Sequence, residues 1–228
     1  SCAAHQRQIG LPLNGGYKFL CHTSPKTSDH VILDGLIRRA LQNILDDLPN
    51  LGANMPSLRA AHAELLRSQP QAPGLEELVP WISRYLPTRT MLQVNSIGSR
   101  LTFGRHLNFV VGGNILGRGL TIDNLLVTYY LRRARTTQMD TMLQHARMYG
   151  YRQPLMPYTR VFLPLSLATR FHHIHEAEQA LRGLLRSPVG TKPTPVELAQ
   201  NLVATRSTIL DGGALAAYRP GLSTPAYF

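Results

Sequence analysis

The chain has 228 residues, of which 43% are hydrophobic and 16% charged, so it can bury a sizeable core and is not a disordered polyelectrolyte. Its 24 Lys and Arg exceed its 13 Asp and Glu by 24 − 13 = 11, a positive charge that favours nucleic acid or nucleotide phosphates, with a plain basic surface as the alternative. Two cysteines, Cys2 and Cys21, exclude a disulfide framework and a zinc-thiolate site, and no apolar run reaches the ~20 residues that span a bilayer. We therefore expect a cytoplasmic protein with no membrane partner. Because the chain begins without methionine, we also expect it to be either a fragment of a longer protein or a processed chain.

The hydrophobic pattern predicts strands that alternate with helices along the chain. In chain order we expect a strand at Tyr17–Cys21, a helix from Asp29 as N-cap to about Leu48, helices at Ser57–Arg67 and Leu75–Leu86, strands at Met91–Val94, Leu107–Val111 and Leu125–Leu131, a helix at Met139–Met148, a strand at Tyr158–Leu163, and helices at Leu167–Leu185 and Val196–Val203. In the first helix, one buried face is predicted to hold Ile32, Leu36, Ala40, Ile44 and Leu48. The alternation predicts an α/β fold with a mostly parallel sheet.

The same pattern predicts the domain organisation. Residues 1–16 form an N-terminal segment, residues 17–186 the main domain, and residues 187–228 a Pro/Gly-rich extension that is irregular apart from one short helix.

A glycine-rich segment, GGNILGRGLTIDN at residues 112–124, joins two of the predicted strands. Its glycines allow close backbone approach, and such a turn can expose amide hydrogens to a phosphate. The spacing fits neither the GxGxxG nor the Walker pattern, so an ordinary tight turn is the alternative.

A second polar cluster, DTMLQHARMYGYR at residues 140–152, is predicted to lie on a helix and just beyond it. Asp140, Gln144 and Arg147 share one helical face, and Arg152 follows the helix end. Fixed guanidinium groups can neutralise the charge on a transferring phosphoryl group. The alternative is an Asp–Arg pair on the surface of a helix.

Together the two segments resemble motifs five and six of the second RecA-like lobe of superfamily-two helicases. The match is closer to the Z1 domain family, described as an endonuclease domain and found with superfamily-two ATPase domains. The blocks that carry the resemblance are FLCHTSPKTSDH (19–30), VVGGNILGRGLTIDNLLVTYYLRR (110–133), DTMLQHARMYGYR (140–152) and FHHIHEAEQALR (171–182). The resemblance implies a RecA-like, parallel-dominated sheet with helices on both faces.

The resemblance also implies roles for single residues. Arg147 corresponds to the arginine finger that reaches the γ-phosphate, with Gln144 positioning it and Arg152 as the second, catalytic arginine. The turn that touches nucleotide and nucleic-acid backbone corresponds to Gly119, Thr121 and Asp123. Contacts to the nucleic-acid backbone are implied for His22, Thr23, Ser24, Lys26, Asn114 and Arg118. Two departures from the helicase pattern are Ala146, where that pattern has glycine, and the later position of Arg152.

The implied function is that of the C-terminal lobe of a nucleic-acid-dependent ATPase in a bacterial restriction or defence system. The implied cofactor is ATP with Mg²⁺, bound mainly by an N-terminal ATPase lobe upstream, and the implied partner is DNA or another nucleic acid. The alternatives are a self-standing nuclease and a non-catalytic basic module that binds nucleic acid. The chain has no Walker lysine and no clustered carboxylates, so we expect the fragment alone to be inactive.

Two further features favour ordinary structural roles. The stretch FHHIHE at residues 171–176 contains zinc-type ligands, but it lacks the HExxH order and is expected to be a plain helix, so no metal site is predicted. Trp81 and Tyr85 are expected in the core rather than on a surface that stacks on bases.

Overall fold

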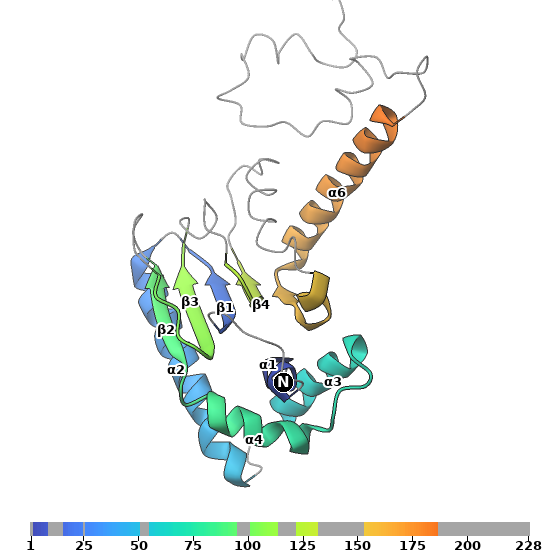
Figure 1. The fold of residues 1–228 in the computed structure, drawn as a ribbon. Helices are drawn as coiled ribbons and strands as arrows, with labels where there is room; N and C mark the ends of the chain where they lie inside the picture. The colour runs from blue at the N-terminus through green and yellow to red at the C-terminus, as the bar shows by residue number, and fades with distance from the viewer. Residues whose placement is uncertain are drawn as a thin grey trace, which may run out of the picture. The chain divides into compact units, whose positions relative to one another are not determined.

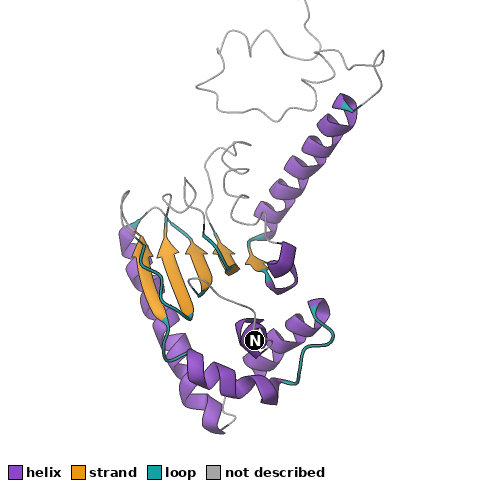
Figure 2. Ribbon diagram, in the orientation of Figure 1, coloured by secondary structure: helices purple, strands orange, loops and turns teal. Residues whose placement is uncertain are grey.

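The computed structural model describes residues 2–8, 16–24, 26–50, 55–94, 101–113, 122–131 and 153–186. Its helices are α1 (Cys2–Gln8), α2 (Thr27–Asp47), α3 (Met55–Ser68), α4 (Leu75–Tyr85) and α6 (Leu165–Leu185), with short 3₁₀ helices η1 (Leu48–Asn50) and η4 (Gln153–Tyr158). Its strands are β1 (Tyr17–His22), β2 (Thr90–Val94), β3 (Leu107–Gly112), β4 (Leu125–Tyr130) and β5 (Arg160–Phe162). The chain divides into two compact units: one holds α1 to α4 and all five strands, and the other holds α6 (Figures 1 and 2).

The five strands form one parallel sheet in the order β2-β3-β1-β4-β5, and Figure 2 shows their arrows pointing the same way. This confirms the predicted α/β class and the parallel sheet. β1 is central, with β3 on one side and β4 on the other, and its residues are buried on both faces although Lys18 and His22 are polar. Phe19 pairs with Phe109 on one face, where their rings lie 5.3 Å apart, while Leu20 and Val110 are fully buried on the other.

α2 lies alongside β2 and β3, and only one end of its predicted buried face is confirmed. Ile32 is 63% and Leu36 54% exposed, whereas the buried stripe there contains His30, Asp34 and Leu41. The prediction was wrong at this end because a strict four-residue spacing drifts by about 40° per step around a helix of 3.6 residues per turn. At the other end, Leu48 is 4% exposed and Ile44 packs against the cluster that contains it, so the prediction is confirmed for these two residues.

The start of α2 also differs from the prediction. The helix begins at Thr27 with Lys26 at the N-cap, so Asp29 lies inside the first turn instead of capping it. A carboxylate is favourable there as well, because the first turn carries the positive end of the helix dipole. Asp29 can thus support the helix terminus without a capping bond.

The core lies between the sheet and the shorter helices. One buried cluster joins α1, α3 and α4 to the strands and to η4 through Ala4, Tyr17, Leu65, Leu78, Leu126 and Tyr158. A second cluster, formed by Leu48, Leu58 and Leu75, joins η1, α3 and α4. The helix α1 was not predicted, yet Ala4 is 7% exposed and belongs to the first cluster. The predicted helices near α3, α4 and α6 are confirmed.

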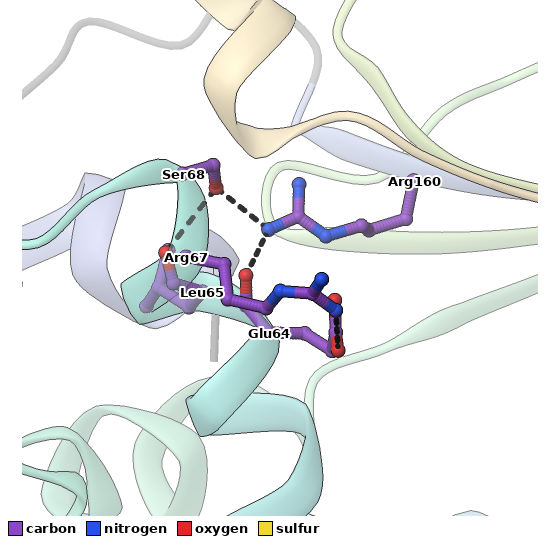
Figure 3. A network of polar contacts seen from close by, with 5 residues as sticks. All are labelled: Glu64, Leu65, Arg67, Ser68 and Arg160. Atoms are coloured by element: carbon purple, nitrogen blue, oxygen red, sulfur yellow. Dashed lines mark hydrogen bonds and ion pairs between the residues drawn. The ribbon is translucent and has the colours of Figure 1, made fainter.

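Arg160 connects β5 to the end of α3 (Figure 3). Its Nη2 donates to the backbone oxygen of Glu64 at 2.5 Å and to Ser68 Oγ at 2.7 Å. Its Nη1 donates to the backbone oxygens of Pro157 at 3.0 Å and Thr159 at 2.9 Å. A guanidinium at the C-terminal end of a helix is favourable, because that end carries the negative pole of the helix dipole. Arg160 thus fixes an edge strand to a helix that lies more than ninety residues earlier.

A tight entry turn sets the start of β1. Gly16 has φ = +66°, and a Cβ at this position would meet the backbone oxygens of His106 and Gly104. Beside it, the buried Asn108 side chain accepts from Gly104 N at 2.7 Å and donates to Gly104 O at 3.1 Å. The close backbone approach therefore requires glycine at position 16.

Part of the expected fold stays a prediction. The predicted helices Met139–Met148 and Val196–Val203 lie outside the described residues, and the domain boundaries and the helical cover on the second sheet face stay predictions. The predicted strand Tyr158–Leu163 is shorter than expected, because Gln153–Tyr158 forms η4 and the strand holds Arg160–Phe162 alone. Within the described part of the chain, no helix is both long and apolar enough to cross a bilayer.

Candidate functional site

The strand order reverses between β1 and β4. From β1 the chain continues to β2 and β3 on one side, whereas from β4 it continues to β5 on the other. In open α/β sheets, ligands bind outside the carboxyl ends of the strands at such a switch point. His22 and Tyr130, which end β1 and β4, are register partners at this edge. The edge is therefore the first place to look for a binding site.

His22 lies at this edge with its side chain turned into the protein. It is 1% exposed, and its ring centroid lies 5.1 Å from that of Tyr130. A direct contact between this imidazole and a phosphate, as the resemblance implied, is not available in this conformation.

Three described residues follow β1 and precede α2, and we call Thr23, Ser24 and Lys26 the switch-point loop. Thr23 and Ser24 are partly buried, while Lys26 is exposed. The backbone N–H of Lys26 donates to Ser24 Oγ at 3.1 Å. Since a hydroxyl can accept and donate at once, Ser24 keeps its own hydrogen for another acceptor.

Two features of the switch-point loop suit an anion. No side chain among the described residues caps the start of α2, whose 21 residues direct their first backbone N–H groups toward this edge. Thr23 Oγ is buried and has no hydrogen-bond partner within the described part of the chain. A hydroxyl in this position can donate a hydrogen bond to an anion, to water or to another part of the chain.

Asp123 lies at the other edge of the sheet. It is exposed and precedes β4, next to Asn124, which has φ = +54° and whose backbone oxygen accepts from Lys18 N at 3.0 Å. The structure therefore does not bring Asp123 together with the switch-point loop. The other predicted site residues lie outside the described residues: Asn114, Arg118, Gly119, Thr121, Gln144, Arg147 and Arg152.

A cavity of about 510 Å³ lies on the sheet face that carries Phe19 and Phe109. Its walls are mostly apolar and include Trp81 and Tyr85, whose rings stack 5.9 Å apart. Trp81 also packs against the buried cluster of the core, which agrees with the predicted core role. The guanidinium of Arg160, which also lines the cavity, already binds four oxygen atoms of the protein. This lining suits apolar contacts rather than phosphate.

The histidines of α6 make local contacts. His172 Nε2 lies 3.2 Å from Glu176 Oε1, one helical turn away, and both side chains are more than half exposed. Among the residues that the structure describes, no group of three or more His, Cys, Asp or Glu is placed to hold a metal ion. Both thiols are free, and burial raises the pKa of Cys21 to about 12.

His30 is a residue of this site that the sequence did not reveal. It lies in the first turn of α2, is 2% exposed, and its Nε2 lies 2.7 Å from the backbone oxygen of Ser24. A six-residue separation between a helix residue and a preceding loop carries no recognisable motif.

Comparison with known proteins gives one finding on identity. No curated protein and no solved structure matches the chain significantly. The model of the Z1 domain matches residues 3–210, which is most of the chain. The match includes every described element from β1 to α6 and the whole switch-point loop. The chain therefore belongs to the Z1 domain family.

Proposed function

We propose that this chain is the C-terminal, helicase-like lobe of a nucleic-acid-dependent ATPase of a bacterial restriction or defence system. In this proposal it binds the nucleic-acid backbone and supplies an arginine finger, whereas ATP and Mg²⁺ are held mainly by an N-terminal lobe upstream. The observation that carries the proposal is the switch-point loop, which stands at the edge where α/β sheets bind ligands.

The chemistry of this loop supports a phosphate partner. Lys26 offers an exposed positive charge, Ser24 a hydroxyl hydrogen, and the start of α2 its backbone N–H groups. Backbone amides, hydroxyls and cationic side chains are the groups that contact nucleic-acid phosphates in proteins. The net charge of +11 also favours association with a polyanion.

The order of the strands supports the helicase-like reading. The glycine-rich segment 112–124 joins β3 to β4 across β1, and the segment with Gln144 and Arg147 joins β4 to β5. An all-parallel sheet with this order is consistent with a RecA-like layout. The chain leaves β4 at the same edge as the switch-point loop, so in this proposal the segment with Gln144 and Arg147 begins from the edge that binds phosphate.

Binding of the 228-residue chain to single-stranded DNA tests the proposal. Lys26→Ala should weaken binding by about tenfold and lower the slope of log K against log salt by about one phosphate contact. Arg39→Ala is the matched control, because it removes the same charge from an exposed position farther along α2. Equal effects of the two substitutions would show that general charge, rather than the switch-point loop, binds the DNA.

A further inference from the structure

The switch-point loop is held by a contact from the helix that follows it. The backbone oxygen of Ser24 can only accept, so the Nε2 of His30 must carry a hydrogen and donate across 2.7 Å. Ser24 is thus held twice, through its carbonyl by His30 and through its hydroxyl by the backbone N–H of Lys26. These two bonds fix the direction in which its remaining hydroxyl hydrogen can point.

The burial of His30 makes this contact a firm one. The side chain is 2% exposed, so water cannot easily replace the carbonyl as its partner. Its position in the first turn of α2 also couples the loop to the helix whose N–H groups face the same edge. A displacement of this imidazole would therefore change both the loop and its relation to the start of the helix.

We propose that His30 is a positioning residue for nucleic-acid binding: it orders the switch-point loop for a phosphate without touching the phosphate itself. This inference rests on the proposed function, since it assigns His30 to the same site. When a binding-competent conformation is populated only in part, the apparent affinity falls by that fraction. Loss of the His30 bond should therefore weaken binding while the other side chains of the loop stay unchanged.

The chain provides a matched control for this contact. His62 on α3 makes the same kind of bond, with Nε2 2.8 Å from the backbone oxygen of Pro73, in a part of the fold away from the switch-point loop. His30→Leu and His62→Leu each remove one imidazole that binds a backbone carbonyl. A glutamine in place of His30 restores an amide N–H of similar reach.

The experiment measures the affinity of the 228-residue chain for a single-stranded DNA oligonucleotide, with the melting temperature recorded for each variant. We expect His30→Leu to weaken binding by about tenfold, as one lost bond of ~1.4 kcal/mol predicts, and His30→Gln to stay within about threefold of the original chain. His62→Leu should bind as the original chain does. In the double variant His30→Leu/Lys26→Ala, the loss should be smaller than the product of the two single losses, because both act on the same loop.

Each other outcome overturns a defined part of the argument. If Lys26→Ala weakens binding and His30→Leu does not, the inference is wrong and the proposed function stands. If His30→Leu and His62→Leu weaken binding equally, or if His30→Gln binds as poorly as His30→Leu, the effect is one of general stability and the positioning role is wrong. If neither Lys26→Ala nor His30→Leu differs from its control, the proposed function fails at this site, and the inference fails with it.

Discussion

The contact between Arg160 and the end of α3 predicts a large difference in stability between two neighbouring arginines. Arg160 makes four hydrogen bonds, whereas Arg67 makes a single ion pair with Glu64 at 2.9 Å and is 77% exposed (Figure 3). Hydrogen bonds to charged groups contribute about 1.5–3 kcal/mol each when buried. Because Arg160 is only partly buried, water can replace some of its partners, and we expect Arg160→Met to cost about 2–3 kcal/mol in total.

This cost translates into a measurable shift in melting temperature. For a chain of this size, 1 kcal/mol corresponds to roughly 2–4 °C, so Arg160→Met should melt about 5–10 °C lower. Arg67→Met should stay within about 2 °C, since exposed ion pairs contribute 1 kcal/mol at most. Arg160→Lys should recover less than half of the loss, because one ammonium group cannot reach both the Glu64 oxygen and the oxygens of Pro157 and Thr159. Thermal unfolding followed by circular dichroism gives all three values.

A double-mutant cycle separates the hydrogen bond from the loss of side-chain volume. Ser68→Ala removes one of the acceptors, and its effect should shrink by about 1 kcal/mol when Arg160 is already Met. The reasoning is refuted if Arg160→Met and Arg67→Met melt at the same temperature, or if the cycle gives no coupling.

Three further predictions follow from single residues. Gly16→Ala should lower the free energy of unfolding by at least about 2 kcal/mol, because φ = +66° and the neighbouring backbone oxygens exclude a Cβ. Gly35→Ala on α2 should instead raise the free energy of unfolding by about 0.5–1 kcal/mol, since no atom lies within 4 Å of the new Cβ. Urea titrations of the two variants compare these effects. Burial raises the pKa of Cys21 from 9.0 to about 12, so the folded state keeps the thiol proton to a higher pH than the unfolded state does. The contribution of this buried thiol to stability is therefore full below pH 9 and falls as the pH rises toward 12. In a Cys2→Ser variant, iodoacetamide at pH 8.5 should label the folded chain far more slowly than the urea-unfolded chain. In the full-length protein, Arg147→Ala should lower the rate of ATP hydrolysis by about 10³-fold or more, while the affinity for ATP stays within a few-fold of the original protein. Arg147→Lys should restore little of the hydrolysis rate. An unchanged rate, or a domain that no longer folds, contradicts the assignment of Arg147 as the arginine finger.

The sheet could be predicted from the sequence because each strand is a short apolar run between turn residues. The parallel direction of the strands could also be predicted, from the alternation of strands and helices along the chain. The rotation of the first half of α2 was predicted wrongly because the strict four-residue spacing ignored the drift of the helix, and the contact between His30 and Ser24 on its buried face left no local pattern. The helix α1 was missed because seven residues give too few apolar positions to show a period.

The candidate site could be predicted only as a set of residues, and its role stays a prediction. Contacts to nucleic acid were expected just after β1, and the pairing of His22 with Tyr130 places the end of this strand at the carboxyl edge of the sheet. The burial of His22 was not expected, because a strand buried on both faces gives no alternation that distinguishes an inward from an outward side chain. The network around Arg160 joins residues more than ninety positions apart, a separation that no local pattern encodes.

The central place of β1 has a consequence for synthesis on the ribosome. Tyr17 pairs with Leu107 and Lys18 pairs with Leu125, so both neighbours of this strand emerge long after it does. At ~5–20 residues per second, the apolar strand waits on the order of 5–20 s for its first partner. During that time α2, α3 and α4 can form from local contacts, whereas the edges of β1 remain open to other chains. Nascent chains that stop before residue 107 should therefore need a chaperone to stay in solution, and those that extend past β4 should not.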